Sequence, residues 1–268
     1  MEWNNVYLAF GLTLFAGMAT AIGGGIAFFA KRTNTIFLSY SLGFSAGVMI
    51  YISFTEILGE ANSIIGEYYA GDASAWMTFL FFISGVGISA LIDKMVPSQE
   101  NPHEVRSLEQ MANGRAYSGK RLLRVGAFTA IAITIHNFPE GIATFISGVS
   151  DITVGISIAI AIAIHNIPEG IAVSVPVYYA TGSRKKAFWW AALSGLSEPI
   201  GALFGYLILS LFTSQIVLGY VFALVAGIMI YISFDEILPA AHKYGKHHAT
   251  IYGLISGIIV IGISLIIL

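Results

Sequence analysis

Residues 134–141 read TIHNFPEG and residues 163–170 read AIHNIPEG, which are two copies of one motif. Each copy carries a histidine, an asparagine, a proline and a glutamate inside a long apolar run. Ionisable side chains are rare in such runs because they need a compensating partner there. The two copies therefore indicate both what kind of fold surrounds them and where a site lies.

The composition outside the motif is that of a membrane protein. Of 268 residues, 56% are hydrophobic and only 10% are charged, too apolar for one soluble domain. The first apolar run lacks a basic segment and a cleavage site, so we expect a retained span and no signal peptide. The chain has no cysteine, which excludes disulfides, thiolate ligands and thiol nucleophiles.

A transmembrane helix needs about 20 apolar residues. Eight runs meet this need, and they predict an all-α integral membrane protein with eight transmembrane helices. The runs lie near residues 6–30, 36–58, 75–95, 125–148, 152–179, 187–212, 216–240 and 249–268.

The placement of charge agrees with this count. All 13 Lys and Arg residues fall in connections one, three, five and seven, whereas the even connections and the termini carry only acidic residues or no charge. Basic connections stay in the cytoplasm, so both termini are predicted outside the bacterial inner membrane. We treat residues 1–268 as one transmembrane domain, with a cytoplasmic loop at 97–123 between spans three and four. No Walker A or GxGxxG sequence occurs, and we predict no nucleotide or nucleic-acid partner.

A second repeat relates spans two and seven. AGVMIYISFTEIL at 46–58 and AGIMIYISFDEIL at 226–238 are identical at eleven of thirteen positions. These spans are predicted to cross in opposite directions, as are the two HNxPEG spans. Inverted repeats are typical of secondary transporters, and a 3+2+3 order of spans fits both matches.

The HNxPEG spacing favours metal binding. His136 and Glu140, and likewise His165 and Glu169, lie four residues apart on one helix face, with Asn137 and Asn166 beside them. Each proline lacks the N–H that would bond the backbone carbonyl four residues earlier, so that carbonyl is left free at the same depth in the membrane as the histidine and the glutamate. A buried carboxylate is unfavourable by about 3 kcal/mol on insertion scales, and a divalent cation compensates it. The alternative is that these groups only hydrogen-bond the helices together.

Other ionisable residues have weaker signals. Glu198 stands in span six before Pro199, and beside the two motifs we favour it as a third acidic ligand. Glu56 and Glu236 end the two repeat copies, where a solvated helix end is the preferred interpretation. For the loop histidines we favour solvation as well; they are His103, His242, His247 and His248.

With HNxPEG present twice and a glutamate in span six, the chain resembles the ZIP (Zrt/Irt-like) family of metal transporters over essentially its whole length. The resemblance implies the 3+2+3 arrangement, a homodimer in the lipid bilayer and import of divalent metal. It maps the metal ligands onto seven residues: His136, Asn137, Glu140, His165, Asn166, Glu169 and Glu198. Some members have aspartate where this chain has Asn166, and that departure puts two-metal binding in doubt.

The resulting hypothesis is a secondary transporter that moves zinc, or iron(II), manganese or cobalt, by alternating access, with no prosthetic group. Two alternatives stay open at this stage. One is a passive metal-selective channel, and the other is an intramembrane metal-dependent hydrolase, although HExxH is absent.

Overall fold

The computed structural model describes residues 3–26, 35–95, 119–211, 214–244 and 247–267. Every regular element in these ranges is helical, which confirms the predicted all-α class. The elements are α1 Trp3–Ile26, α2 Thr35–Ile52, η1 Ser53–Ile57, α3 Leu58–Gly66, α4 Asp72–Met95, α6 Gly119–Ser150, α7 Ile152–Thr181, α8 Arg184–Gly195, α9 Ser197–Leu211, α10 Gln215–Ile232, η3 Ser233–Ile237, α11 Leu238–Tyr244 and α12 His247–Ile267.

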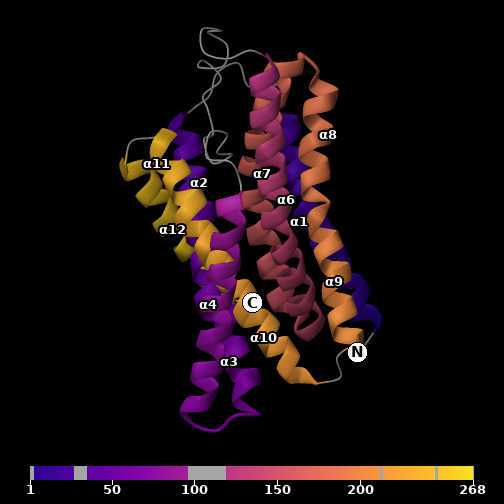
Figure 1. Ribbon diagram of the computed structural model, residues 1–268, viewed down its shortest axis with the longest axis vertical. Coiled ribbons are helices and arrows are strands. Elements are labelled where there is room, and N and C mark those ends of the chain that lie inside the picture. Colours follow the sequence, from indigo (N-terminus) through magenta and orange to yellow (C-terminus); the bar gives the residue numbers. More distant parts are fainter. Residues whose placement is uncertain (1–2, 27–34, 96–118, 212–213, 245–246, 268) are drawn as a thin grey trace.

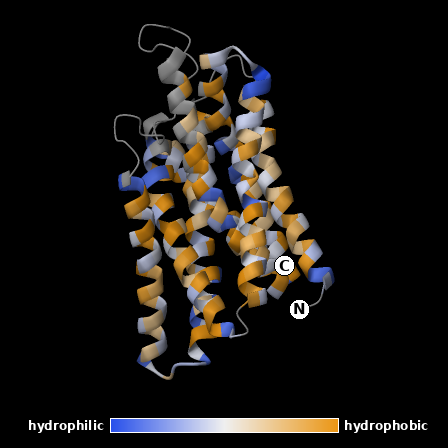
Figure 2. Ribbon diagram, turned by 45° about the vertical axis from the view of Figure 1, so that its right-hand side comes forward, coloured by the Kyte–Doolittle hydropathy of each residue, from blue (hydrophilic) through white to orange (hydrophobic). Residues whose placement is uncertain are grey.

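These helices form rods of membrane-spanning length. Seven stretches of the described chain are long and apolar enough to cross a bilayer, and three of them combine consecutive elements: α2 with α3, α8 with α9, and α10 with η3. Helix α6, which carries the first HNxPEG copy, is an eighth rod of 32 residues. Figure 2 shows long apolar stretches along the rods, with hydrophilic residues mostly near their ends and at a few places between helices.

Helix α6 begins within the predicted cytoplasmic loop 97–123. Helix α6 already begins at Gly119, so residues 119–123 are helical, and the rest of the predicted loop lies outside the described residues. Lys and Arg are good helix formers, and the polar end of a helix leaves no trace in a search for apolar runs. The span therefore continues beyond its apolar part.

The rods pack as two bundles that do not follow chain order (Figure 1). Helices α1, α6, α7, α8 and α9 pack on one another and contain both HNxPEG copies; we call them the motif bundle. Helices α2, α3, α4, α10, α11 and α12 form the second group and contain both AGxMIYISFxEIL copies; we call them the repeat bundle. The two sequence repeats thus occupy separate bodies of the protein.

Glycines bring helices into backbone contact within each bundle. A β-carbon at Gly170 of α7 would overlap the Thr20 carbonyl oxygen of α1, and one at Gly227 of α10 would overlap the Phe82 carbonyl oxygen of α4. All such overlaps at described glycines join helices of the same bundle. Between the bundles, α2 meets α7 and α10 meets α6 through aliphatic and aromatic side chains. Close packing of small residues stabilises helix pairs in lipid, so each bundle is built as a compact unit.

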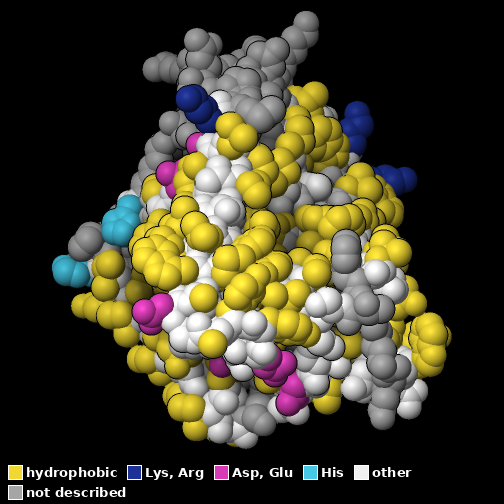
Figure 3. Space-filling model, turned by 60° about the horizontal axis from the view of Figure 1, so that its bottom comes forward, with side chains coloured by type: hydrophobic (Ala, Val, Ile, Leu, Met, Phe, Trp, Pro, Cys, Tyr) yellow, Lys and Arg dark blue, Asp and Glu magenta, His cyan; other side chains and the backbone are white. Residues whose placement is uncertain are grey.

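The two ends of the molecule differ in charge. Lys94 lies in the last turn of α4 and residues 184–186 begin α8, at what we call the basic end. The opposite end carries acidic residues such as Glu60, Asp72 and Asp151, and we call it the acidic end. In Figure 3 the Lys and Arg side chains lie along the upper rim, and most Asp and Glu side chains lie below them. Both termini lie in the lower half of Figure 1, away from the basic end.

Candidate metal centre

The two HNxPEG copies lie side by side because α6 packs against α7. Both helices continue through their prolines, so Pro139 and Pro168 do not end them. The seven residues named from the sequence are all buried, and none exposes more than 6% of its surface. They are His136, Asn137, Glu140, His165, Asn166, Glu169 and Glu198.

Four of these side chains converge at the contact between the two helices. The Nε2 atom of His136 lies 3.3 Å from Oε1 of Glu140 and 3.2 Å from Oε1 of Glu169. The Nε2 atom of His165 lies 3.2 Å from the same Glu140 oxygen. One ligand atom each from His136, His165 and Glu169 fall within 4.8 Å of one another. Each glutamate therefore contacts a histidine of the other motif copy.

Three of the separations are close to those of neighbouring ligands around a tetrahedral metal ion. Zinc binds imidazole nitrogen and carboxylate oxygen at about 2.0–2.2 Å, so neighbouring ligands of a tetrahedron lie about 3.3–3.6 Å apart. The atom pairs given above are at 3.2–3.3 Å. Moreover, His136 Nε2 and Glu140 Oε1 make no hydrogen bond of good geometry, although both are fully buried. A buried polar atom left in this way calls for an explanation, and a bound ion is one.

Asn137 lies next to this cluster. When its amide is oriented so that the nitrogen faces acceptors, it donates to Oε2 of Glu169 at 3.2 Å and to the Ile133 carbonyl at 3.1 Å. A rotation of the amide would instead present its oxygen to the cluster. Asn137 is thus placed either to orient Glu169 or to add an oxygen ligand.

Asn166 and Glu198 contact each other through their side chains. The Asn166 amide nitrogen donates to the Ala16 carbonyl of α1 at 2.9 Å and to Oε1 of Glu198. Glu198 lies in the first turn of α9 and is fully buried. The seventh predicted ligand therefore contacts the asparagine of the second motif copy.

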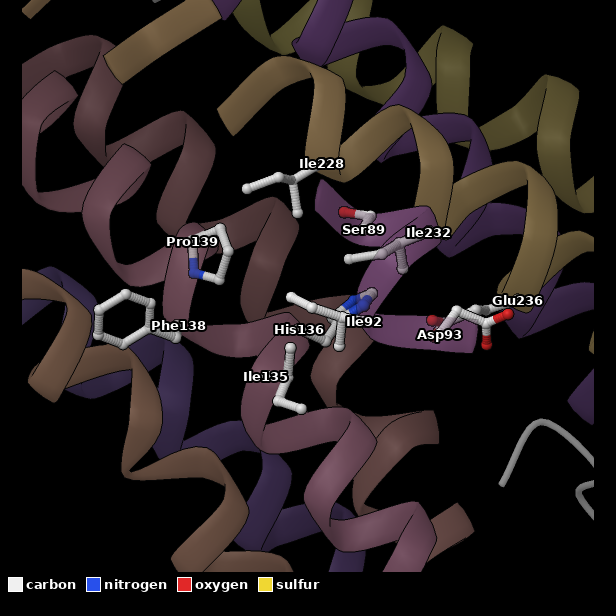
Figure 4. Close-up of a pocket in the computed structure, with 10 residues that line it drawn as sticks. All are labelled: Ser89, Ile92, Asp93, Ile135, His136, Phe138, Pro139, Ile228, Ile232 and Glu236. Carbon is white, nitrogen blue, oxygen red and sulfur yellow. The ribbon is translucent and has the colours of Figure 1, made fainter. Parts of the chain in front are cut away.

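A cavity of about 180 Å³ reaches the cluster from the basic end. Figure 4 shows His136 projecting from α6 into it, with the carboxyl groups of Asp93 and Glu236 to one side. Asp93 is absent from the residues predicted above. Its only signal in the sequence is an acidic residue in the last turn of span three, directly before Lys94.

A second cavity of about 190 Å³ lies toward the acidic end. Glu56, Glu60 and Asp151 line it together with Ser147 and Ser150. None of the seven motif residues lines it. Each copy of the AGxMIYISFxEIL repeat thus contributes a glutamate to one cavity: Glu56 lines the acidic-end cavity and Glu236 lines the basic-end cavity.

The loop histidines are not part of the cluster as far as the described residues extend. His242 lies in α11, where its Nδ1 is 2.9 Å from the Leu238 carbonyl oxygen. His103 lies outside the described residues.

An all-helical membrane protein that buries imidazoles and carboxylates between two helices belongs to the class in which such residues mark a functional site within the membrane. Residues 93–265 match the family model described as ZIP Zinc transporter. The chain belongs to the ZIP family, which confirms the resemblance seen in its motifs.

The curated relatives agree over the full length. The chain is 55% identical to "Zinc transporter ZupT" of Nitratidesulfovibrio vulgaris, covering 98% of both chains. It is 54% identical to the protein of the same name from Clostridium perfringens, over 98% of this chain and 96% of that one. For the Lysinibacillus sphaericus protein the identity is 55% over 99% of both. Members of this family are transporters, so the chain is not an enzyme and the hydrolase alternative is set aside.

Proposed function

We propose that this protein imports zinc, and also iron(II), manganese and cobalt, across the cytoplasmic membrane of a bacterium. Zinc comes first because the relatives are named zinc transporters. Imidazole with carboxylate accepts the other ions as well. The observation that carries the proposal is that Glu140 of one motif copy lies 3.2 Å from His165 of the other.

In this proposal one ion binds between α6 and α7 during transport. His136, Glu140, His165 and Glu169 supply its ligands, in agreement with their separations of 3.2–3.3 Å. The ion is cargo, and no prosthetic group is needed. Two carboxylates in a dehydrated place repel each other, and a doubly charged ion removes that repulsion.

Transport by alternating access is supported by the unequal cavities. The basic-end cavity is lined by His136, whereas the acidic-end cavity is lined by none of the motif residues. A carrier in one of its two conformations has this arrangement. The apolar contact between the bundles, without glycine overlaps, suits a movement of the motif bundle against the repeat bundle. The 3+2+3 repeat order is part of the same proposal.

The orientation follows from charge. We place the basic end in the cytoplasm and both termini outside, because positive residues are retained on the cytoplasmic side. Ions then enter near Glu56, Glu60 and Asp151 and leave near Asp93 and Glu236. A homodimer in the bilayer completes the proposal, and the mass of the purified protein in nanodiscs tests it.

Uptake of labelled zinc into proteoliposomes tests the function. Native protein should take up zinc, whereas Glu140→Ala and Glu169→Ala should abolish uptake. Glu67→Ala is the matched control, since Glu67 is exposed and distant from both motifs in the sequence. Equal uptake by the native protein and both buried-site variants would contradict the proposal.

The same liposomes separate a carrier from a channel. In liposomes loaded with unlabelled zinc, a carrier accelerates the uptake of labelled zinc. Each return of the binding site to the outside then exchanges one ion for another. A passive channel gives no such counterflow. Counterflow and saturation at high zinc concentration are the expected results.

A further inference from the structure

The turn between α7 and α8 carries three basic residues in a row at the basic end of the motif bundle. Arg184, Lys185 and Lys186 begin α8, and all three are exposed. No Asp or Glu occurs between Glu169 and Glu198 in the sequence. The helix does not compensate the three charges either, because the N-terminal end of a helix disfavours cations. We call residues 184–186 the basic turn, and it has no acidic residue of its own.

Hydrogen bonds hold the backbone beside the basic turn in one shape. The Gly182 N–H donates to the Tyr178 carbonyl at 2.7 Å, and the Ser183 N–H donates to the Thr181 hydroxyl at 3.2 Å. The Ser183 hydroxyl accepts from the Lys186 N–H at 3.3 Å. Gly182 has a φ of 65°, a conformation that glycine adopts readily at the end of a helix. The backbone that carries the three cations is therefore ordered before any partner binds.

An exposed apolar face follows the basic turn along the same rod. Lys185, Trp189 and Leu193 are spaced by four residues, so they lie on one face of α8. The face continues with Leu196 and, in α9, Ile200, and all four of its apolar side chains are exposed. Helices α8 and α9 together are long and apolar enough to cross a membrane. A lipid molecule beside this rod would therefore meet charge first and apolar side chains next.

The order of side chains along this face matches one half of a bilayer. Basic side chains attract anionic headgroups, tryptophan favours the region between headgroups and hydrocarbon, and leucine favours the acyl chains. At 1.5 Å per residue, Lys185 and Trp189 lie about 6 Å apart along the helix axis, and Leu193 lies about 6 Å further. A free phosphate ion would contact only the cations. The continuity of the charged and apolar parts therefore favours a phospholipid.

We propose that the basic turn and the apolar face form a docking surface for an anionic phospholipid of the phosphatidylglycerol type. The phosphate of such a lipid is not neutralised by an ammonium group, and it pairs with the three cations. One acyl chain lies along Trp189, Leu193 and Leu196. Each cation beside an anionic surface contributes about a fivefold preference, so three cations select anionic over zwitterionic lipid. The proposal goes beyond metal transport and does not depend on it.

Lys94 provides a matched control at the same end of the molecule. It is exposed in the last turn of α4, but Asp93 directly precedes it, so this pair of neighbours has no net charge. Lys94→Gln and Lys185→Gln make the same chemical change. Only the second removes a charge from the docking surface.

Quenching of tryptophan fluorescence by brominated lipids tests the proposal. The double variant Trp3→Phe/Trp76→Phe keeps Trp189 and Trp190 as its only tryptophans. The full-length protein is placed in phosphatidylcholine nanodiscs that contain increasing fractions of either brominated phosphatidylglycerol or brominated phosphatidylcholine. Half-maximal quenching should need at least about tenfold less of the anionic lipid, since three cations act together. Equal quenching by the two lipids would overturn the proposal.

Variants in the same background separate the docking surface from a general attraction to the basic end. Lys185→Gln should lower the preference about fivefold, and replacement of the whole basic turn by glutamine should abolish it. Lys185→Glu should lower it further than Lys185→Gln, which decides the case if the triple variant does not fold. Lys94→Gln should keep the native preference, and a loss equal to that of Lys185→Gln would contradict a docking surface at α8.

Inorganic phosphate distinguishes the lipid from the free ion. Phosphate added to the nanodiscs should relieve quenching no more than sodium chloride of the same ionic strength does, because the apolar face holds only the lipid. Greater relief by phosphate would assign the basic turn to the free ion, and the proposed lipid would be wrong.

Discussion

Glu140 contacts a histidine of each motif copy. Its Oε1 lies 3.3 Å from Nε2 of His136 and 3.2 Å from Nε2 of His165, so one oxygen serves both helices. Its charge is fully buried, and without histidines or an ion it would be unfavourable. Its loss should therefore disturb both copies, as should the loss of His136, whose Nε2 contacts a glutamate of each copy.

We predict that Glu140→Gln weakens zinc binding by more than about 100-fold, beyond the loss typical of residues that only orient a ligand. The amide has nearly the shape of the carboxylate but lacks its charge. Calorimetric titration of purified protein measures the change. Glu67→Gln, on the exposed end of span two, should bind zinc as the native chain does; a similar affinity for both variants would refute the role of Glu140.

Three adjacent glycines in α1 provide a matched pair for stability. A β-carbon at Gly23 would overlap the Ile167 carbonyl, which lies inside the second HNxPEG copy, whereas nothing lies within 4 Å of one at Gly25. Gly23→Ala should destabilise the protein by about 1–3 kcal/mol through forced displacement of α7. Gly25→Ala should be neutral or stabilising, since alanine favours helix.

The unfolding temperature in detergent measures both variants. Displacement of α7 should also lower zinc uptake by Gly23→Ala, because His165 and Glu169 flank Ile167. Equal unfolding temperatures for the two variants would mean that this helix contact contributes nothing.

Part of the site is predictable from single residues. Four-residue spacing places His136 with Glu140, and His165 with Glu169, on their helix faces, and the structure brings these pairs together. Asp93 is not predictable in this way, because one acid at a helix end is ordinary until a cavity is seen beside it. Spacing along the chain also does not tell which helix Glu198 faces.

At the scale of elements, Asp151 combines two tasks at the start of α7. Its carboxylate accepts hydrogen bonds from the Thr153 and Val154 backbone N–H groups at 2.8 and 3.3 Å, and it also lines the acidic-end cavity. Asparagine caps helices as well as aspartate does, whereas alanine removes about 1 kcal/mol. Two substitutions therefore separate the cap from the charge.

We predict that Asp151→Ala lowers the unfolding temperature and that Asp151→Asn does not. If the charge attracts incoming ions, both variants should show a raised KM for zinc uptake with little change in the maximal rate. Uptake kinetics in liposomes give both values. A normal KM for Asp151→Asn would restrict Asp151 to its role as a helix cap.

The helix boundaries and the π-helices show how far periodicity predicts elements. Apolar length predicts the rods, but neither the charged start of α6 nor the change to π-helix at residues 53–57 and 233–237 has a hydropathy signal. The identity of the two repeats predicts only that both copies fold alike, which they do. π-Helices often occur at functional sites, and each here carries one glutamate that lines a cavity.

For the whole molecule, the order of the repeats does not predict which rods pack together. An inverted repeat tells only that two helices cross the membrane in opposite directions. A helix of given direction can still pack against several different neighbouring helices. The choice is made by glycines whose partner is a distant backbone carbonyl, such as Gly43 against Thr250 and Gly141 against Glu198. The sequence does not show which helix packs against a given glycine, so the division into two bundles is known only from the structure.

The absence of cysteine makes the movement of the bundles measurable with single thiols. Ile232 lines the basic-end cavity and Ser147 lines the acidic-end cavity. A cysteine at either position can be labelled with a membrane-impermeant maleimide only while its cavity is open to water. Alternating access closes one cavity as it opens the other.

We therefore predict opposite changes when zinc is added to both sides of the membrane. Labelling of Ile232→Cys and of Ser147→Cys should shift in opposite directions, because one population of conformers grows as the other shrinks. Mass spectrometry of the labelled protein measures each rate. A cysteine at exposed Glu67, directly after the span that ends at Gly66, provides the reference for general accessibility. Parallel changes at both positions would instead indicate a continuous pore, and the carrier mechanism would have to be replaced by a channel.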